Sequence, residues 1–382
     1  MSETPAPRQG RSPRRRLFSA AAILIGVMAA IPLADIGLNL WQSRIGSSPT
    51  AVVRRTAHSH PRIYEETPGG YRLRRFLDED IVDPISGRTT HMRTNALGMR
   101  SGPIEPKKPG EFRILALGDS ITLASYNEEN EAWPAILEGL LRKSAAIDTA
   151  RSVRVLNAGV SGAALREELL ILNETGLLVQ PDVVIVGLFL NDATRSRMFA
   201  VPEGLLAYSA LARRMAEQRE VNAALEESRA EYVRLSGNPF PTEADSDNAW
   251  RTDRAAFESQ IANAASDWGR GWFAWAWDEM RPDLEIMREL GKRHGFKLLV
   301  ALFPATIQVE ADFLDERPQA LFRATLSALE IPHVDLLPAL RTDYQSRRQS
   351  LSYDHGHLKP DGDRVAAEAI AQAMHDAGFM TP

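Results

Sequence analysis

Ser120 and the pair formed by Asp354 and His357 are the residues of this chain whose types and spacing suit nucleophilic catalysis. Ser120 stands in Gly118-Asp119-Ser120, between an apolar run and a helical pattern. Gly118 permits a tight turn, and a serine at a helix start can offer its hydroxyl and its backbone N–H to a bound carbonyl group. Taken alone, these three residues also fit an ordinary strand-to-helix turn in which Asp or Ser caps the helix.

Asp354 and His357 are the acid and base that such a serine needs. They lie in a loop ahead of the last predicted helix. Residues three apart in a turn face the same side, so Asp354 can accept from Nδ1–H of His357 and leave Nε2 to take the Ser120 proton. His355 is the competing base, but it adjoins Asp354 directly, which makes that carboxylate poorly placed to orient its ring. The spacing therefore favours His357.

Gly159 and Asn191 are the candidates for binding an oxyanion. Each follows a predicted strand, and the carboxyl ends of neighbouring parallel strands converge in space. We therefore expect the N–H groups of Ser120 and Gly159 and the side-chain amide of Asn191 to surround the oxyanion of an acyl-transfer intermediate. Each residue alone also fits a turn or a helix cap.

Short apolar runs alternate with helical patterns from Phe112 onward, which predicts an α/β fold. The runs are rich in β-branched and aromatic residues and cover Phe112 to Leu117, Val153 to Val160, Asp182 to Leu190, Phe296 to Phe303 and His333 to Leu337. The helical patterns cover Glu131 to Lys143, Ala163 to Leu178, Pro282 to His294, Pro318 to Glu330 and Pro360 to Ala377. Strands that are apolar on both faces favour a parallel five-stranded sheet covered by helices on each side.

The segment at about 193–281 does not fit this alternation and is interpreted as a helical insertion. An insertion after the third strand emerges at the functional edge of the sheet, where it can form a lid. Its residues Trp268, Trp272 and Trp275 are spaced for one face of a helix. Packing is favoured over sugar stacking for this strip, and Gly269 and Gly271 weaken the helix.

Composition excludes several classes of protein. The 382 residues carry a formal net charge of −5, and their basic residues are spread along the chain, which argues against nucleic-acid binding. There is no cysteine, so disulfides, thiolate nucleophiles and cysteine-based metal sites are excluded. Without a His-Glu-x-x-His pattern, we expect no catalytic metal.

The amino-terminal part predicts a membrane anchor. Residues 1–16 form a basic tail with five arginines, and an apolar run that opens the segment 17–40 is long enough to span a bilayer. The positive flank predicts a single-pass protein of the inner (cytoplasmic) membrane whose catalytic part is periplasmic or extracellular. A cleaved signal peptide is the alternative. Residues 41–110, rich in Arg, Pro, Gly and Thr, are interpreted as a linker and an irregular or β-rich preface.

The catalytic candidates resemble, in order, the four conserved blocks of the SGNH or GDSL hydrolases: Gly118-Asp119-Ser120, Gly159, Asn191-Asp192 and Asp354-x-x-His357. The resemblance covers 111–382. It implies a flavodoxin-like three-layer αβα fold, no cofactor, and hydrolysis of esters that include lipids, acetylated sugars and small acyl compounds. Ile121 replaces the leucine of the family name, and the insertion after Asn191 departs from the pattern, so the substrate is not carried over.

Three functions remain open at this point. The leading hypothesis is a serine ester hydrolase, a carboxylesterase or acylhydrolase that forms an acyl-enzyme and deacylates esters such as acetylated envelope glycans. The second is an O-acyltransferase that uses the same triad to modify an envelope polysaccharide. The third is a non-catalytic envelope protein that binds glycans, which would have no need for Ser120, Asp354 and His357.

Overall fold

The computed structural model describes residues 63–67, 70–82, 88–144, 152–193, 248–265 and 267–380, together with residues 230 and 233. These residues belong to one compact unit. The predicted basic tail at 1–16, the anchor at 17–40 and nearly all of residues 194–247 of the insertion lie outside the described residues. Within the part of the chain that is described, no helix combines the length and the apolar character that a membrane span requires.

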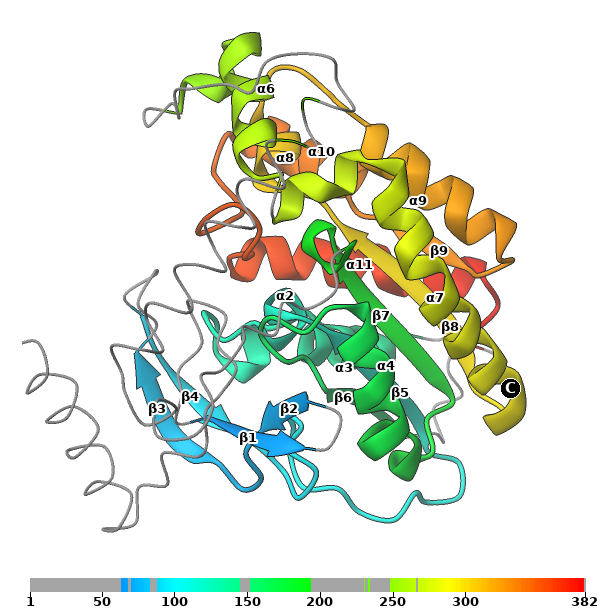
Figure 1. Ribbon diagram of the computed structural model, residues 1–382. Coiled ribbons are helices and arrows are strands. Elements are labelled where there is room, and N and C mark those ends of the chain that lie inside the picture. Colours follow the sequence, from blue (N-terminus) through cyan, green and yellow to red (C-terminus); the bar gives the residue numbers. More distant parts are fainter. Residues whose placement is uncertain are drawn as a thin grey trace, which may run out of the picture. The chain divides into compact units, whose positions relative to one another are not determined.

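A five-stranded parallel sheet forms the centre of this unit, as the alternating pattern predicted (Figure 1). Its strands are β5 (Phe112–Gly118), β6 (Val153–Asn157), β7 (Val183–Phe189), β8 (Lys297–Phe303) and β9 (His333–Asp335). All seven residues of β7 are buried, which explains its uninterrupted apolar sequence. The α/β class and the parallel sheet are therefore confirmed.

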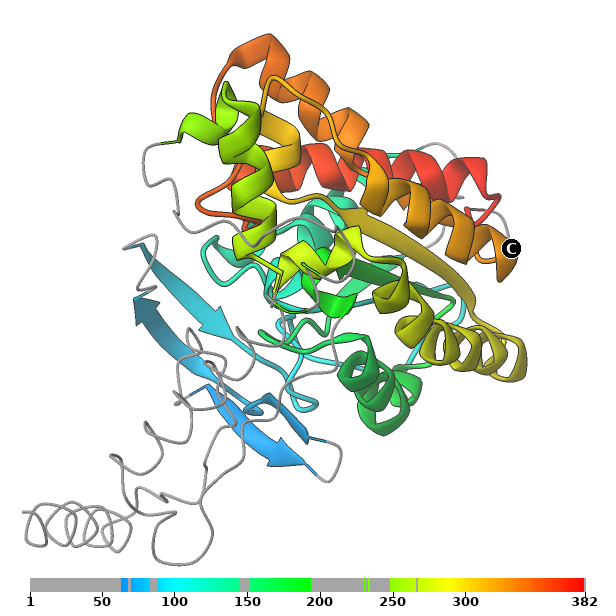
Figure 2. The ribbon, with the colours of Figure 1, turned by 45° about the horizontal axis from the view of Figure 1, so that its top comes forward.

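Two groups of helices cover the sheet. In one group α3 (Trp133–Lys143) and α10 (Leu337–Arg347) pack on α11 (Pro360–Asp376), and in the other α7 (Ala274–His294) packs on α4 (Leu165–Ile171) and α9 (Arg317–Ala328). The two groups lie on opposite faces (Figures 1 and 2). The strand order β6-β5-β7-β8-β9 explains this, because right-handed crossovers that run in opposite directions from β5 place their helices on opposite faces.

The strand order also fixes where a site can form. The chain steps from β5 to β6 in one direction and then crosses back to β7, so the order reverses between β5 and β7. Ligands of open α/β sheets bind beyond the carboxyl ends of the strands at such a reversal. The residues after β5 and β7 are Asp119, Ser120 and the segment that contains Asn191.

Several helices differ from the sequence-based expectation. The helix predicted from Pro282 begins eight residues earlier, at Ala274, so Pro282 lies inside a 21-residue helix. Burial of Trp277, Met280 and Leu284 on its inner face offsets the hydrogen bond that proline removes. The tryptophan strip does not share one helix, because the 3₁₀ helix η7 (Trp268–Trp272) ends before α7 begins. Helices α8 (Thr306–Glu310) and α10 were not predicted, whereas α6 (Arg254–Asn263) falls within the predicted helical insertion.

The described part of the preface forms two antiparallel hairpins, in agreement with the β-rich one of the two predicted alternatives. They pair β1 (Tyr64–Thr67) with β2 (Gly70–Leu73) and β3 (Asp78–Val82) with β4 (Thr89–Arg93). Their buried side chains form a second small core with residues that follow β5 and β6, namely Leu123, Val160 and Ala163. The preface therefore packs directly against the segment that carries Ser120.

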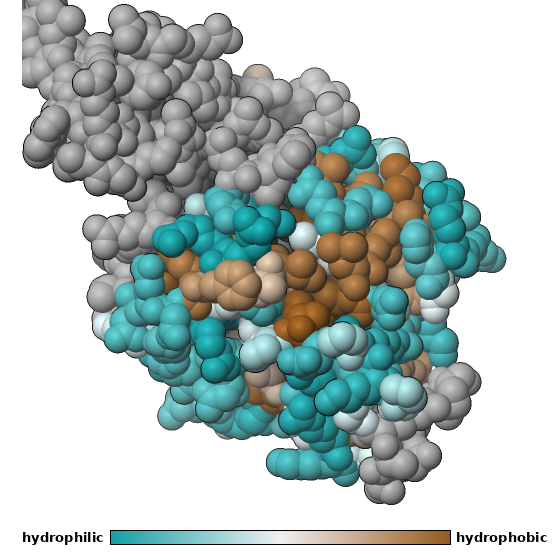
Figure 3. All heavy atoms as spheres, turned by 90° about the horizontal axis from the view of Figure 1, so that it is seen from below, coloured by the Kyte–Doolittle hydropathy of each residue, from teal (hydrophilic) through white to brown (hydrophobic). Residues whose placement is uncertain are grey.

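Apolar side chains also reach the surface in places. On the face shown in Figure 3, hydrophobic residues gather in an area bordered by hydrophilic ones. The large hydrophobic residues most exposed in the described part of the chain are Phe76 at 73% and Leu178 at 67%. Isolated apolar residues of this kind are common on protein surfaces.

Candidate active site

Ser120 begins the short helix α2 (Ser120–Leu123) directly beyond the end of β5. The carboxylate of Asp119 caps this helix by accepting from the N–H of Ile121 at 2.8 Å. Gly118 has a φ of +154°, and a Cβ on it would lie 2.0 Å from Oγ1 of Thr122 and 2.9 Å from the carbonyl oxygen of Gly187. Only glycine fits here, so the sequence Gly-Asp-Ser builds a sharp turn that presents Ser120 at the reversal of the strand order.

Ser120, His357 and Asp354 form a continuous hydrogen-bonded chain. Nε2 of His357 lies 2.9 Å from Oγ of Ser120, and Nδ1 of the same ring lies 2.7 Å from Oδ2 of Asp354. The other oxygen of Asp354 accepts from the backbone N–H groups of Gly356 and His357 at 3.0 and 2.9 Å. The structure thus brings together the three residues that the spacing singled out, and His357 rather than His355 contacts the serine.

Electrostatics keep Asp354 ionised. Burial alone would raise its pKa, but the hydrogen bond from His357, the charges of His357 and His355 and the Gly356 N–H together hold the pKa of this carboxyl well below its usual range. An ionised Asp354 fixes the ring of His357 with Nδ1 protonated and Nε2 free to accept a proton.

Residues that sequence reasoning missed hold the loop of Asp354 and His357 in place. Thr306, which follows β8, donates through Oγ1 to the carbonyl oxygen of Asp354 at 2.6 Å and through N–H to that of His355 at 2.8 Å. The ring of Tyr126 packs on the ring of His357 with centroids 4.3 Å apart. Thr306 carried a usable signal, since it follows the carboxyl end of the fourth strand just as the predicted residues follow theirs.

Gly159 lies beside the nucleophile helix, but its N–H is already used. A Cβ on Gly159 would lie 2.3 Å from the backbone nitrogen of Leu123, so glycine is required for this close approach. Its N–H donates to Oδ1 of Asn157 at 2.9 Å, and Nδ2 of Asn157 donates to the carbonyl oxygen of Thr122 at 2.8 Å. An oxyanion role for Gly159 stays a prediction and requires this N–H to be shared with the substrate.

Asn191 lies in the 3₁₀ helix η4 (Leu190–Ala193), and its side chain forms a hydrogen bond with the carboxylate of Asp119. Its Oδ1 is buried and has no hydrogen-bond partner in the described part of the chain. The bond to Asp119 occupies one N–H of the amide, and a second N–H remains for a substrate. Asn191 and Ser120 therefore both contact Asp119, as expected for strand ends that converge.

Three carboxyl groups, those of Asp119, Glu168 and Asp192, are buried in this region, and Glu168 was not predicted from the sequence. Burial raises the pKa of Asp119 to about 6 and raises the pKa values of Glu168 and Asp192 well above their ordinary values. The charge of Asp119 raises the pKa values of Glu168 and Asp192 further. Asp192 accepts from the N–H of Phe189 at 2.7 Å. Protonation of such groups removes the cost of burying several negative charges together.

The insertion reaches the site through its tryptophans. The helix η7 packs on η4, and the ring of Trp268 stacks on the ring of His355 with centroids 6.4 Å apart and an angle of 17°. Trp272 is buried and donates from Nε1 to Asp315 at 3.0 Å, which is a packing role. The contact of Trp268 with His355 places the insertion beside the triad, and this contact was not predicted from the sequence.

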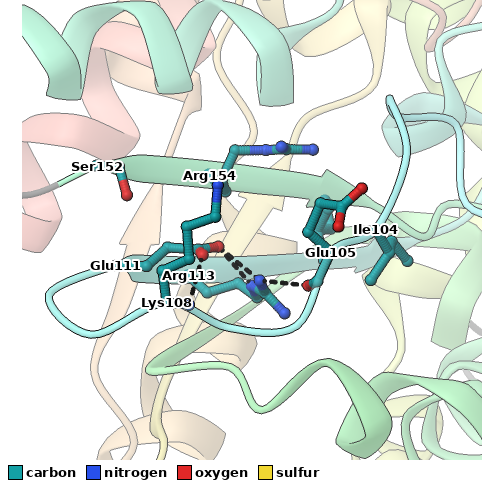
Figure 4. A pocket seen from close by; sticks show the side chains of 8 residues that line it. Ile104, Glu105, Lys108, Glu111, Arg113, Ser152 and Arg154 are labelled. Carbon is teal, nitrogen blue, oxygen red and sulfur yellow. Dashed lines mark hydrogen bonds and ion pairs between the residues drawn. The ribbon is translucent and has the colours of Figure 1, made fainter.

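The pocket in Figure 4 is a different feature, because it lies at the amino ends of β5 and β6. Its central cation, Arg113, is paired with Glu111 at 2.6 Å and donates to the carbonyl oxygens of Val179 and Glu105. These polar groups satisfy one another, so the pocket is structural. Across the described ranges, no cluster of three or more His, Asp or Glu side chains suits a metal ion.

Comparison with known families agrees with this geometry. Residues 114–270 match the model of the family described as GDSL-like Lipase/Acylhydrolase. The chain carries a GDSL-like lipase/acylhydrolase domain. The family and the triad together make this chain a serine hydrolase that acts on ester bonds. The matched region contains Ser120, Gly159 and Asn191. Asp354 and His357, which complete the triad, lie after it in the sequence of this GDSL-like chain.

Solved structures similar to this GDSL-like chain include two acetylxylan esterases and the protein TesA, and no curated protein matches it. Axe2, an acetylxylan esterase from Geobacillus stearothermophilus, is 15% identical with a TM-score of 0.40 over 71% of this chain and 95% of its own. The acetyl xylan esterase AlAXEase is 13% identical with a TM-score of 0.38 over 70% and 99%. TesA is 14% identical with a TM-score of 0.39 over 69% and 98%. Similarity at this level transfers no substrate to this chain.

Proposed function

We propose that this GDSL-like hydrolase cleaves esters through an acyl-enzyme on Ser120. Oγ of Ser120 attacks the ester carbonyl carbon while Nε2 of His357 takes its proton, and Asp354 stabilises the imidazolium that forms. The backbone N–H of Ser120 and the side-chain amide of Asn191 bind the oxyanion. When the intermediate collapses, His357 returns the proton to the leaving alcohol, and a water molecule then repeats the cycle to release the acid.

The observation that carries this proposal is the hydrogen-bonded chain from Ser120 through His357 to Asp354, with distances of 2.9 and 2.7 Å. Nucleophile and base lie within hydrogen-bond reach, and the base is oriented by a third group, which is the arrangement that activates a serine. The N–H of Ser120 has no acceptor in the described part of the chain, so it is available to a substrate.

Substitution of Ser120 tests this proposal. Ser120→Ala is expected to lower kcat for an aryl acetate by roughly 10⁴- to 10⁶-fold and to abolish covalent labelling by a fluorophosphonate. Ser125→Ala is a matched control, because Ser125 lies in the same segment and, in the described part of the chain, is bound only through its backbone carbonyl, which accepts from Oγ1 of Thr90 at 2.8 Å. Aryl acetate hydrolysis by Ser120→Ala at the wild-type rate would disprove the mechanism.

We further propose that the catalytic part works outside the cytoplasmic membrane on acylated envelope glycans. The support is the basic tail at 1–16 ahead of the apolar segment at 17–40. An enzyme tethered beside the membrane meets envelope polymers during their assembly. Fractionation of cells, combined with protease treatment of spheroplasts, tests the location. A chain that stays in the soluble cytosolic fraction would contradict it.

Transfer of the acyl group is the competing fate of the same acyl-enzyme. A sugar hydroxyl in place of water would make the protein an O-acyltransferase, with Ser120 and His357 in unchanged roles. Product analysis with an aryl acetate and rising concentrations of a soluble glycan separates the two. Hydrolysis predicts free acetate at every glycan concentration, whereas transfer predicts an acetylated glycan whose yield rises with acceptor.

A further inference from the structure

The side chain of Asn127 is fully buried and forms four hydrogen bonds. Its Nδ2 donates to the carbonyl oxygen of Leu358 at 3.0 Å and to Oδ2 of Asp363 at 2.7 Å. Its Oδ1 accepts from the hydroxyl of Tyr353 at 3.1 Å and from Nη1 of Arg88 at 3.2 Å. Both hydrogens and both lone pairs of the amide are therefore used.

These contacts join the two halves of the triad. Tyr353 precedes Asp354 and Leu358 follows His357, so Asn127 binds the loop that carries the base, residues 353–358, at both of its ends. Its own backbone belongs to the nucleophile segment. The N–H of Asn127 donates to the carbonyl oxygen of Ala124 at 3.0 Å, and the N–H of Ala124 donates to the carbonyl oxygen of Ser120 at 2.9 Å. A short, fully bonded path thus connects Ser120 to the loop of His357.

Two arginines of the preface, Arg88 and Arg100, donate hydrogen bonds to Asn127 and its neighbours. Nη1 of Arg100 donates to the carbonyl oxygens of Leu123 and Ala124 at 2.9 and 2.7 Å, and Nη2 donates to that of Asn127 at 2.7 Å. Arg100 is itself 1% exposed. Arg88 bonds to the Tyr353 hydroxyl and reaches Glu131 at 3.1 Å. Arg100 thus binds the nucleophile segment, and Arg88 connects this segment to the base loop at Tyr353.

We propose that Asn127 is a positioning residue for the triad, which sets the distance between Ser120 Oγ and His357 Nε2 by joining the two segments that carry them. The inference rests on the proposed function of Ser120 and His357. Asn127 is buried away from solvent, so it acts through these residues and does not contact the substrate. A displacement of about 1 Å at a reacting group can lower the rate by roughly 10²-fold.

Only an amide satisfies all four partners. Two acceptors, Leu358 O and the carboxyl of Asp363, face its nitrogen, while two donors, the Tyr353 hydroxyl and Arg88, face its oxygen. Asp in place of Asn127 keeps the shape but puts an oxygen against the two acceptors. This isosteric change therefore removes the N–H donated to the carbonyl oxygen of Leu358 and keeps the volume, which separates hydrogen bonding from packing.

The test compares Asn127→Asp and Asn127→Ala with the wild type in the full chain. Both variants are expected to lower kcat for an aryl acetate by roughly 10²-fold, to leave KM unchanged, and to slow fluorophosphonate labelling of Ser120 in parallel. Asn173→Ala is the matched control, because Nδ2 of Asn173 makes a single local bond to Leu169 O at 2.9 Å. It is expected to keep wild-type kcat.

Two further measurements make the outcome decisive. Tyr353→Phe removes only the hydroxyl that donates to Asn127. It is expected to lower kcat by roughly three- to tenfold and to leave the melting temperature unchanged, so it tests the inference even where Asn127 variants fail to fold. The low-field proton resonance of His357 Nδ1, bonded to Asp354, is expected to shift or broaden in both Asn127→Asp and Tyr353→Phe.

This resonance also separates the inference from the proposed function. If the wild type hydrolyses no ester, the proposed function fails, while a shifted His357 resonance in the variants still supports positioning by Asn127. Wild-type kcat and an unchanged His357 resonance in folded Asn127→Asp or in Tyr353→Phe would overturn the inference. A change confined to KM would overturn it as well, because it would place Asn127 in substrate binding.

Discussion

Asp354 illustrates how a single carboxylate can serve both structure and chemistry. One of its oxygens accepts from His357 Nδ1 at 2.7 Å, and the other accepts from two backbone N–H groups that shape the loop. The structural bonds need only an oxygen, which asparagine also supplies. The bond to His357 needs an acceptor for Nδ1–H, and its negative charge favours the imidazolium.

Asp354→Asn is therefore expected to fold normally and to lower kcat by roughly 10⁴-fold, because Asn can hold His357 in the wrong tautomer. Burst kinetics with an aryl acetate measure the acylation step directly. Asp376→Asn serves as the control, since Asp376 is exposed and contacts Gln372 Nε2 at 2.8 Å at the end of α11. A loss of less than tenfold would argue that Asp354 does not orient the base.

The pKa of Asp119 is shifted in the opposite direction from that of Asp354. Burial raises its pKa from 3.8 to about 6, so the folded protein binds a proton that the unfolded chain has already released between these values. The free energy of unfolding therefore falls as pH rises from about 4 to about 6, and above this range the buried charge costs on the order of 3 kcal/mol.

Asp119→Asn should remove this cost. An amide keeps the cap to the N–H of Ile121 and can donate to the unpartnered Oδ1 of Asn191. We expect a higher melting temperature than wild type at pH 8 and a difference that shrinks towards pH 4. Asp253→Asn, at an exposed N-cap that accepts from Ala256 N–H at 2.9 Å, is the control. Equal melting temperatures at pH 8 would contradict a buried, charged Asp119.

At the scale of elements, helix α2 depends on how closely the loop after β6 approaches it. Gly159 makes this approach possible, since a Cβ there would lie 2.3 Å from Leu123 N and 2.8 Å from Thr122 C. These are backbone atoms of the helix that carries Ser120, so they cannot move aside without moving the nucleophile. The glycine thus has a structural role whether or not its N–H contacts an oxyanion.

Gly159→Ala is expected to lower both the melting temperature and kcat, the latter by roughly 10²-fold, because the added methyl displaces α2. Gly139→Ala in α3 is the matched control, because a Cβ there meets nothing within 4 Å and alanine favours a helix by up to about 1 kcal/mol. Calorimetry and aryl acetate kinetics measure both effects. A Gly159→Ala protein as active as Gly139→Ala would show that α2 tolerates the displacement.

The elements that sequence could predict are those with a local signal. All five strands of the parallel sheet were placed because buried parallel strands are short, continuous apolar runs. Ser120, Asp354 and His357 could be paired because they follow such runs or share a turn. The start of α7 was misplaced because Pro282 resembles a first-turn proline, and only tertiary packing holds it inside the helix. Trp268 beside His355 depends on a contact across 87 positions, which no local pattern encodes.

At the scale of the whole molecule, the preface, which was predicted only as irregular or β-rich, is part of the framework of the site. Arg88 contacts Tyr353 across 265 positions, and Arg100 caps the helix of Ser120. Contacts of this kind depend on the finished fold, so composition rich in Arg, Pro and Gly gave no indication of them. Charged side chains in a polar segment are usually solvated, whereas here the fold buries Arg100, and its guanidinium donates to three backbone carbonyl oxygens.

Removal of the preface should therefore lower activity strongly, although every predicted catalytic residue remains. A chain that starts at Ile104 lacks Arg88 and Arg100 and exposes Leu123 and Val160, which are buried in the small core of the preface. We expect it to lose at least about 10²-fold in kcat and in fluorophosphonate labelling of Ser120.

A chain that starts at Val53 is the control, because it keeps every residue of the two hairpins, and it is expected to hydrolyse aryl acetate at the wild-type rate. Both chains are compared after gel filtration, so that only compact protein is assayed. Equal labelling of the two would mean that the sheet and its helices position Ser120 and His357 unaided. The expected difference instead follows from the hydrogen bonds of Arg100, since three carbonyl oxygens behind Ser120 lose their donor at once.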